Sequence, residues 1–167
     1  MDATELFDDP RLTTMGLLFE AFEGVVTKLE PVWKAHGLSG LDLNALMRLS
    51  RSPNRRLRMT DLAAQTRLST SGVTRLVDRL ARSGLVEREL DPGDRRSAYA
   101  VLTDPGADRL AQVLPDYLDA VERWFTGLLT PAQLDGLISA LRTVRDLTNP
   151  DATVGVDQPA KQRSSAG

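Results

Sequence analysis

The sequence contains no cysteine, one histidine and only three lysines among its 167 residues. The absence of cysteine excludes disulfide bonds, thiolate metal sites and thiol redox sensing. One histidine is too few for a zinc site built on several imidazoles. No apolar run approaches the roughly 20 residues that span a bilayer, and residues 1–5 lack the basic and apolar regions of a secretory signal. We therefore expect a soluble, cytoplasmic protein without a metal or another cofactor.

Charges of opposite sign are segregated along the chain. The segment from Arg48 to Arg96 carries twelve arginines and six acidic residues, a net charge of +6, whereas the remainder carries −8. These two contributions leave the small overall charge of −2. A basic segment inside an acidic protein is an electrostatic footprint for a polyanion. A charged solvated surface would not explain the segregation, so we expect nucleic acid as the partner.

The spacing of apolar residues predicts a mainly helical chain. Steps of three and four predict a long amphipathic helix over 12–36, with Pro31 near its end and Gly37 closing it. Further helices are predicted at about 40–51, 59–67 and 70–82, and in two stretches within 103–148. Pro115 lies inside the first of those two stretches and predicts a kink there.

A tight turn with two adjacent arginines is formed by Asp91-Pro92-Gly93-Asp94-Arg95-Arg96. Proline fixes φ and glycine permits a positive φ, which favours a turn. Strand-like runs at 85–90 and 98–102 flank it and predict a β-hairpin. The turn alone fits a solvated surface hairpin equally well. Beside a helix–turn–helix, however, the hairpin is typical of a wing whose Arg95 enters a neighbouring minor groove. Asp94 would then orient an arginine rather than contact DNA. Arg96 could be the arginine that enters the groove or the one that Asp94 orients.

The predicted 70–82 helix has the two faces of a DNA-recognition helix. One face is apolar, and the opposite face carries short polar side chains and arginines. Its first turn offers hydroxyls and free backbone N–H groups, which bind phosphate well. Arginine pairs bidentately with guanine in the major groove. The DNA-binding candidates are Ser69, Thr70, Ser71, Thr74, Arg75, Arg79, Asp94, Arg95 and Arg96.

The order of the predicted elements divides the chain into four parts. Residues 37–102 form a winged helix–turn–helix DNA-binding domain, and residues 149–167 form a small, polar, disordered tail. Long helices at 1–36 and 103–148 flank the domain and carry apolar stripes that are too wide for so small a domain to cover. We expect these flanking helices to interlock across a two-fold axis as dimerisation helices. Ordinary packing within one chain is the alternative.

The chain resembles the MarR family of bacterial transcription regulators over about residues 12–148. The resemblance rests on residues 71–80, on Gly84-Leu85-Val86, on the turn at 91–96 and on Leu102-Thr103 followed by Gly106. It implies a homodimeric winged-helix regulator, usually a repressor, that binds pseudo-palindromic promoter DNA and is often released by a small molecule. Carried over to this sequence, the base or phosphate contacts are Thr74, Arg75 and Arg79, and the wing contact is Arg95.

The resemblance has one departure and leaves the effector open. Arg58 stands where many relatives have a threonine that caps the next helix, so this cap is in doubt. Family effectors often lie in a crevice between the dimerisation helices and the DNA-binding lobe. This location makes Trp33 and His36 candidates for binding an aromatic or anionic effector, although a core tryptophan and a surface histidine are the alternative. The peroxide-sensing branch needs cysteine and is set aside.

Two other classes of function were weighed. An enzyme is not expected, because the sequence lacks a cysteine nucleophile, a phosphate-binding loop and a metal cluster, and no motif surrounds its one histidine. A winged-helix interaction module, or an activator without an effector, remains the alternative to a repressor. The twelve arginines of the central segment favour DNA binding.

Overall fold

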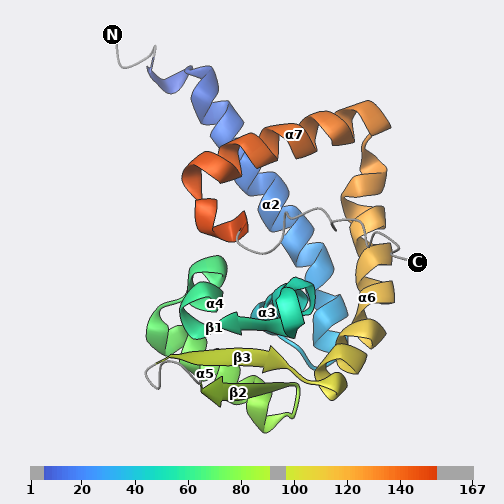
Figure 1. Cartoon of the computed structure of the whole chain (residues 1–167). Coiled ribbons are helices and arrows are strands. Elements are labelled where there is room, and N and C mark those ends of the chain that lie inside the picture. Colours follow the sequence, from blue (N-terminus) through green and yellow to red (C-terminus); the bar gives the residue numbers. More distant parts are fainter. Residues whose placement is uncertain (1–5, 91–96, 154–167) are drawn as a thin grey trace, which may run out of the picture.

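The computed structural model describes residues 6–90 and 97–153 (Figure 1). It is mainly helical with a small antiparallel sheet, which confirms the predicted fold class. In chain order the elements, with η for a 3₁₀ helix, are α2 (Pro10–Ala35), α3 (Gly40–Arg51), η1 (Pro53–Arg55), β1 (Arg56–Arg58), α4 (Met59–Thr66), α5 (Thr70–Arg82), β2 (Val86–Leu90), β3 (Ala98–Leu102), α6 (Asp104–Trp124), η2 (Thr126–Leu128), α7 (Pro131–Thr148) and η3 (Pro150–Thr153).

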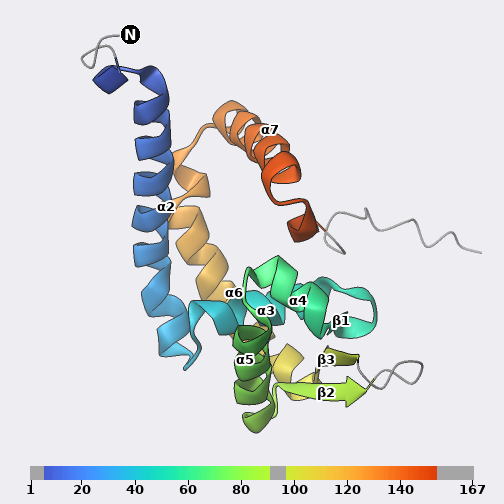
Figure 2. The same cartoon turned by 90° about the vertical axis from the view of Figure 1, so that its left-hand side faces the viewer.

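The elements form two parts that meet along α3 and α6. Helices α2 and α6 run side by side, and α7 lies near their far ends (Figures 1 and 2). Helices α3, α4 and α5 and the three strands form a separate lobe at the other end of the molecule. Over the described residues, no helix combines the length and the apolarity that crossing a lipid bilayer requires.

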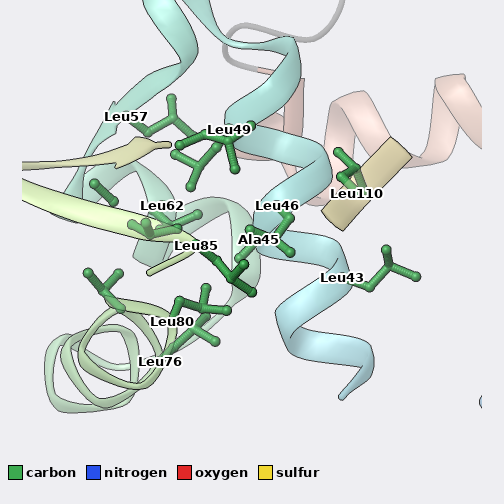
Figure 3. Packing of buried hydrophobic residues seen from close by; sticks show 14 of the residues in the cluster. Leu43, Ala45, Leu46, Leu49, Leu57, Leu62, Leu76, Leu80, Leu85 and Leu110 are labelled. Carbon is green, nitrogen blue, oxygen red and sulfur yellow. The ribbon is translucent and has the colours of Figure 1, made fainter. Parts of the chain in front are cut away.

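The hydrophobic core belongs almost entirely to the lobe (Figure 3). Leu46 and Leu49 of α3 and Leu62 of α4 are completely buried, and the apolar face of α5 packs against them. In contrast, α2 buries only Leu29, and α7 buries no residue. Burial of apolar area is the dominant stabilising term in folding, so the lobe accounts for most of the stability of a single chain.

Side-chain caps fix where the helices begin. Ser39 and Thr130 each form a capping box, at the starts of α3 and α7. Ser69 and Thr103 accept hydrogen bonds from backbone N–H groups at the starts of α5 and α6. Arg58, which precedes α4, makes no side-chain cap, as the departure from the family pattern suggested.

The sheet has the order β1-β3-β2, with antiparallel pairing throughout. The predicted hairpin is present, since β2 pairs with β3 from Val86 opposite Leu102 to Leu90 opposite Ala98. Strand β1 was not predicted. Its three residues form a strand because they pair with β3, with Leu57 opposite Ala100.

Two segments differ from the sequence-based expectation. Helix α2 begins at Pro10, two residues before the predicted start, with Asp9 as its cap, and it ends at Ala35. The segment 149–167 was expected to be a disordered tail, but it begins with η3, which packs against α4. The rest of that tail lies outside the described residues.

Candidate nucleic-acid interface

Helix α5 lies at the end of the molecule opposite α7 (Figure 2). Its buried face consists of Val73, Leu76, Val77 and Leu80, all at most 2 % exposed. This face anchors the helix in the core and leaves the opposite face to solvent. The exposed side chains on that side include Ser71, Arg75, Asp78 and Arg82. The division into two faces is the one predicted from the sequence.

The first turn of α5 is rich in hydroxyl groups. Ser69 Oγ accepts a hydrogen bond from the backbone N–H of Gly72 at 3.1 Å and lies 3.1 Å from Ser71 Oγ. Thr74 Oγ1 donates to the Thr70 carbonyl at 2.8 Å. Ser69, Thr70 and Ser71 are exposed, and Thr74 is half-buried. The helix therefore presents hydroxyls and backbone N–H groups together, an arrangement that suits phosphate oxygens.

Arg75 and Arg79 have different surroundings. Within the described part of the chain, no ion pair or hydrogen bond engages the exposed Arg75 guanidinium, so it can reach a ligand. The Arg79 guanidinium instead donates to Asp42 Oδ1 of α3, from Nε at 3.1 Å and from Nη2 at 2.6 Å. The sequence placed both arginines among the DNA-contacting residues. The structure places Arg79 on the flank of α5 that faces α3.

A hollow of about 180 Å³ is lined by the start of α5, by α4 and by residues of the sheet. Its polar lining comes from Arg58, Thr60, Thr70, Thr74, Arg88 and Ser97. Sequence reasoning named only the two residues of α5 among these. The central arginine block indicated the charge of Arg58 and Arg88, but only the pairing of β1 and β2 with β3 brings both arginines beside α5.

Of the wing, the structure describes the two strands β2 and β3. Two guanidinium groups of β1 lie over the ring of Tyr99 in β3, with Arg56 Cζ 4.6 Å and Arg58 Cζ 5.5 Å from its centroid. Arg58 Nε also donates to the Tyr99 hydroxyl at 3.2 Å. The predicted wing contacts Asp94, Arg95 and Arg96 lie outside the described residues.

The two effector candidates, Trp33 and His36, have different surroundings at the end of α2. Trp33 packs on the start of α3, where a Cβ atom on Gly40 would lie 3.4 Å from its ring. The His36 ring lies 2.8 Å from Asp116 Oδ2 of α6. His36 lines a hollow of about 220 Å³ between the two parts of the molecule, together with Asp42, Arg79, Arg109 and others. Trp33 is not part of that lining.

The described residues offer no metal site. Across 6–90 and 97–153, no group of three or more histidine, aspartate or glutamate side chains lies close enough together to hold a metal ion.

The chain matches known regulators both in sequence and in fold. Residues 36–97 match the MarR family model. An uncharacterised HTH-type transcriptional regulator of Bacillus subtilis, YkoM, is 34% identical over 110 residues, which cover 65% of this chain and 69% of YkoM. The HTH-type transcriptional repressor YetL of the same organism is 32% identical, with 62% of each protein covered. The crystal structure of Sco3205, a MarR family regulator from Streptomyces coelicolor in complex with DNA, superposes with a TM-score of 0.76 at 32% identity, covering 86% of this chain and 91% of that one.

Proposed function

The chain belongs to the MarR family of transcription regulators, and on this premise we propose that it is a homodimeric repressor that binds a pseudo-palindromic promoter site. The observation that carries the proposal is α5, a helix anchored by four buried side chains that presents hydroxyls, backbone N–H groups and Arg75 to solvent. A regulator of this kind acts on the chromosome, which places it in the cytoplasm.

The residues of α5 divide the work of binding. Ser69, Thr70 and Ser71 surround the helix N-terminus and bind backbone phosphate, because the positive end of the helix dipole favours an anion there. Thr74 and Arg75 read base edges in the major groove, and arginine pairs most specifically with guanine. Phosphate contacts fix the register of the protein on DNA, and base contacts give the specificity.

The wing adds a second contact region in this proposal. Arg95 enters the minor groove beside the recognition helix, where a narrow groove concentrates negative potential. Arg96 binds a neighbouring phosphate, and Asp94 orients one of the two arginines. The pairing of β2 with β3, the two strands that precede and follow this turn in the sequence, supports this role.

The dimer is supported by apolar side chains that a single chain leaves uncovered. Phe22 is 66% exposed on α2, and Leu147 is 81% exposed on α7. An apolar hollow of about 330 Å³ lies between these helices and is lined by Leu18, Ala21, Phe22, Val25, Phe125, Leu137 and Leu141. Exposed apolar surface of this kind marks an interaction site, and we infer that the same helices of a second copy cover it across a two-fold axis.

Release by an effector is a further part of the proposal. A small aromatic or anionic molecule that binds near Trp33 and His36, where α2 joins the lobe, changes the angle between the dimer helices and α5. Two recognition helices that dock about 34–36 Å apart tolerate little change in spacing. The hollow beside His36 supports this part of the proposal.

The test is fluorescence anisotropy with a labelled duplex from the region upstream of the protein's own gene and a scrambled duplex of equal length, at two salt concentrations. We expect tight binding of one dimer to the first duplex and weak, strongly salt-dependent binding to the second. Equal and weak binding to both would count against this operator. If sequences selected from a random pool also bind no more tightly than scrambled DNA, the proposed function as a sequence-specific regulator would be contradicted.

A further inference from the structure

One buried carboxylate connects the start of α3 with the recognition helix. Asp42 is 6% exposed. Its Oδ2 accepts hydrogen bonds from the backbone N–H and the hydroxyl of Ser39, at 2.8 and 2.6 Å. Its Oδ1 accepts from Nε and Nη2 of Arg79 in the third turn of α5. One carboxylate oxygen of Asp42 therefore binds the start of α3, and the other binds α5.

Ser39 belongs to the joint between α2 and the lobe. Gly37 adopts a positive φ of 70° after α2, and the backbone N–H of Leu38 bonds to the Trp33 carbonyl at 2.9 Å. The capping box of α3 begins two residues after Gly37. The Asp42 carboxylate therefore joins the base of a dimerisation helix to α5 through a single side chain.

The environment of Asp42 keeps this carboxylate charged. Burial raises its pKa, but the hydrogen bonds from Ser39 and the bond and charge of Arg79 outweigh burial, so the pKa lies below its ordinary value. A buried charge that loses its partner is strongly unfavourable, so Arg79 and Asp42 hold each other in place. The Arg79 side chain remains 48% exposed beside this contact.

We propose that Asp42 is a positioning residue for DNA recognition, and that Arg79 acts mainly by holding α5 against α3 through Asp42 rather than by contacting DNA. This inference rests on the proposed function, since it assigns how α5 is aimed at the major groove. It departs from the role that the sequence suggested for Arg79.

The inference and a direct phosphate contact predict opposite results for Asp42→Asn. Asparagine keeps the volume and an oxygen for Ser39, but it loses the charge that pairs with Arg79. If Arg79 contacts a phosphate, removal of the carboxylate that neutralises it should tighten binding to any DNA. If Asp42 aims α5, the same change weakens binding to the operator instead, because the base contacts are misplaced.

The experiment compares Asp42→Asn, Arg79→Gln and the double variant of the full-length protein by anisotropy on a selected operator and on scrambled DNA, across a salt series. We expect each single variant to lose roughly tenfold in operator affinity, and the double variant to be no worse than either, because the two side chains act as one pair. Affinity for scrambled DNA and the slope of log affinity against log salt should stay close to those of the native protein, which a general loss of folded protein would not allow.

Asp9→Asn is the matched control. Asp9 also caps a helix and pairs with an arginine, Arg11, and its substitution changes the net charge by the same amount. We expect this variant to keep the operator affinity of the native protein. Should Asp42→Asn fail to fold, as thermal unfolding would reveal, Arg79→Gln decides alone, through an operator-specific loss at an unchanged salt slope.

Two outcomes overturn the inference. One is a salt slope reduced by about one in Arg79→Gln, with equal losses on both DNAs, since that is the behaviour of a phosphate contact. The other is an operator affinity that Asp42→Asn leaves unchanged or improves. If the native protein itself does not prefer the operator to scrambled DNA, the proposed function fails first, and the inference fails with it.

Discussion

Gly106 illustrates how one residue fixes the position of a helix relative to the wing. It lies in the first turn of α6, where Thr103 Oγ1 accepts from its backbone N–H at 3.0 Å and donates to the Gly84 carbonyl at 2.7 Å. A Cβ atom on Gly106 would overlap the backbone oxygen of Leu85 and lie 2.8 Å from Leu102 Cδ1. The Leu-Thr-x-x-Gly motif is thus explained by a cap and a close approach of two backbones.

The substitution Gly106→Ala is expected to destabilise the protein by about 1–3 kcal/mol, because the added methyl group overpacks the contact with Leu85. Alanine normally stabilises a helix interior by about 1 kcal/mol relative to glycine. Gly136→Ala on α7 is the control, since a Cβ there meets nothing within 4 Å. Urea denaturation measures both free energies of unfolding, and a Gly106→Ala protein as stable as the native one would contradict the packing argument.

Arg75 tests the base-reading role of α5. If Arg75 reads a guanine, Arg75→Ala should cost about 1–3 kcal/mol on the operator and relax specificity at one base pair of each half-site. Arg82→Ala, on the same face two turns further along, should affect all sequences alike. Binding to an operator library with single base-pair changes separates the two effects. An equal loss on every sequence for Arg75→Ala would refute base reading.

The Asp42 carboxylate also predicts a pH dependence of stability. Its pKa in the folded protein lies below the ordinary value of 3.8, so its contribution is present above that value and is lost as pH falls through the folded pKa. The difference in the free energy of unfolding between the native protein and Asp42→Asn should be largest near neutral pH and shrink below about pH 4. Urea denaturation at about pH 7 and pH 3 checks the direction. A difference of the same size at both would contradict it.

Single residues show where sequence reasoning stops. The buried and exposed faces of α5 could be predicted, because they follow from a period of 3.6 within one helix. The pairing of Arg79 with Asp42 could not, since 37 residues separate the two and only the packing of α5 on α3 brings them together. For the same reason the sequence did not show that His36 meets Asp116.

At the scale of elements, substitutions of Ser69, the cap of α5, can change the stability of the protein and its DNA binding independently. Ser69→Ala should destabilise the protein by about 1 kcal/mol, because the Gly72 N–H loses its acceptor. Ser69→Asp keeps a cap and should keep the stability, but its charge should repel phosphate and weaken DNA binding severalfold. Thermal unfolding and anisotropy on the same samples provide both quantities. Tighter DNA binding by Ser69→Asp would argue against a phosphate at this helix end.

Elements with a strong internal period were predicted more closely than those that depend on partners. The ranges predicted for α3 and α5 agree with Gly40–Arg51 and Thr70–Arg82. Strand β1 has three residues and becomes a strand only beside β3, so it was missed. Helix α2 contains Pro31 and continues for one further turn to Ala35.

At the scale of the molecule, the two parts differ in how much of their apolar surface a single chain buries. The lobe has a closed core, whereas α2 and α7 expose large apolar side chains. Wide apolar stripes on these helices were visible in the sequence as a 3.6-residue period. The partner that covers them was not, because a stripe does not say what packs against it. A second copy is the occupant that we propose.

The substitution Phe22→Glu tests this dimer. A charge placed in the apolar face of α2 should shift the protein from dimer to monomer, because burying an unpaired carboxylate is costly. Leu90→Glu at the end of β2 is the matched control, since Leu90 and Phe22 are both 66% exposed but Leu90 lies on the wing. Sedimentation equilibrium gives the mass of each variant. A Phe22→Glu protein that remains dimeric would place the interface elsewhere.

The most direct test of the whole account is the selection of bound sequences from a random DNA pool with the purified protein. A dimer that reads two half-sites with α5 should enrich an inverted repeat whose half-site centres lie about 10–10.5 base pairs apart, or a multiple of that distance. An enriched motif without two-fold symmetry, or no enriched motif at all, would contradict the account.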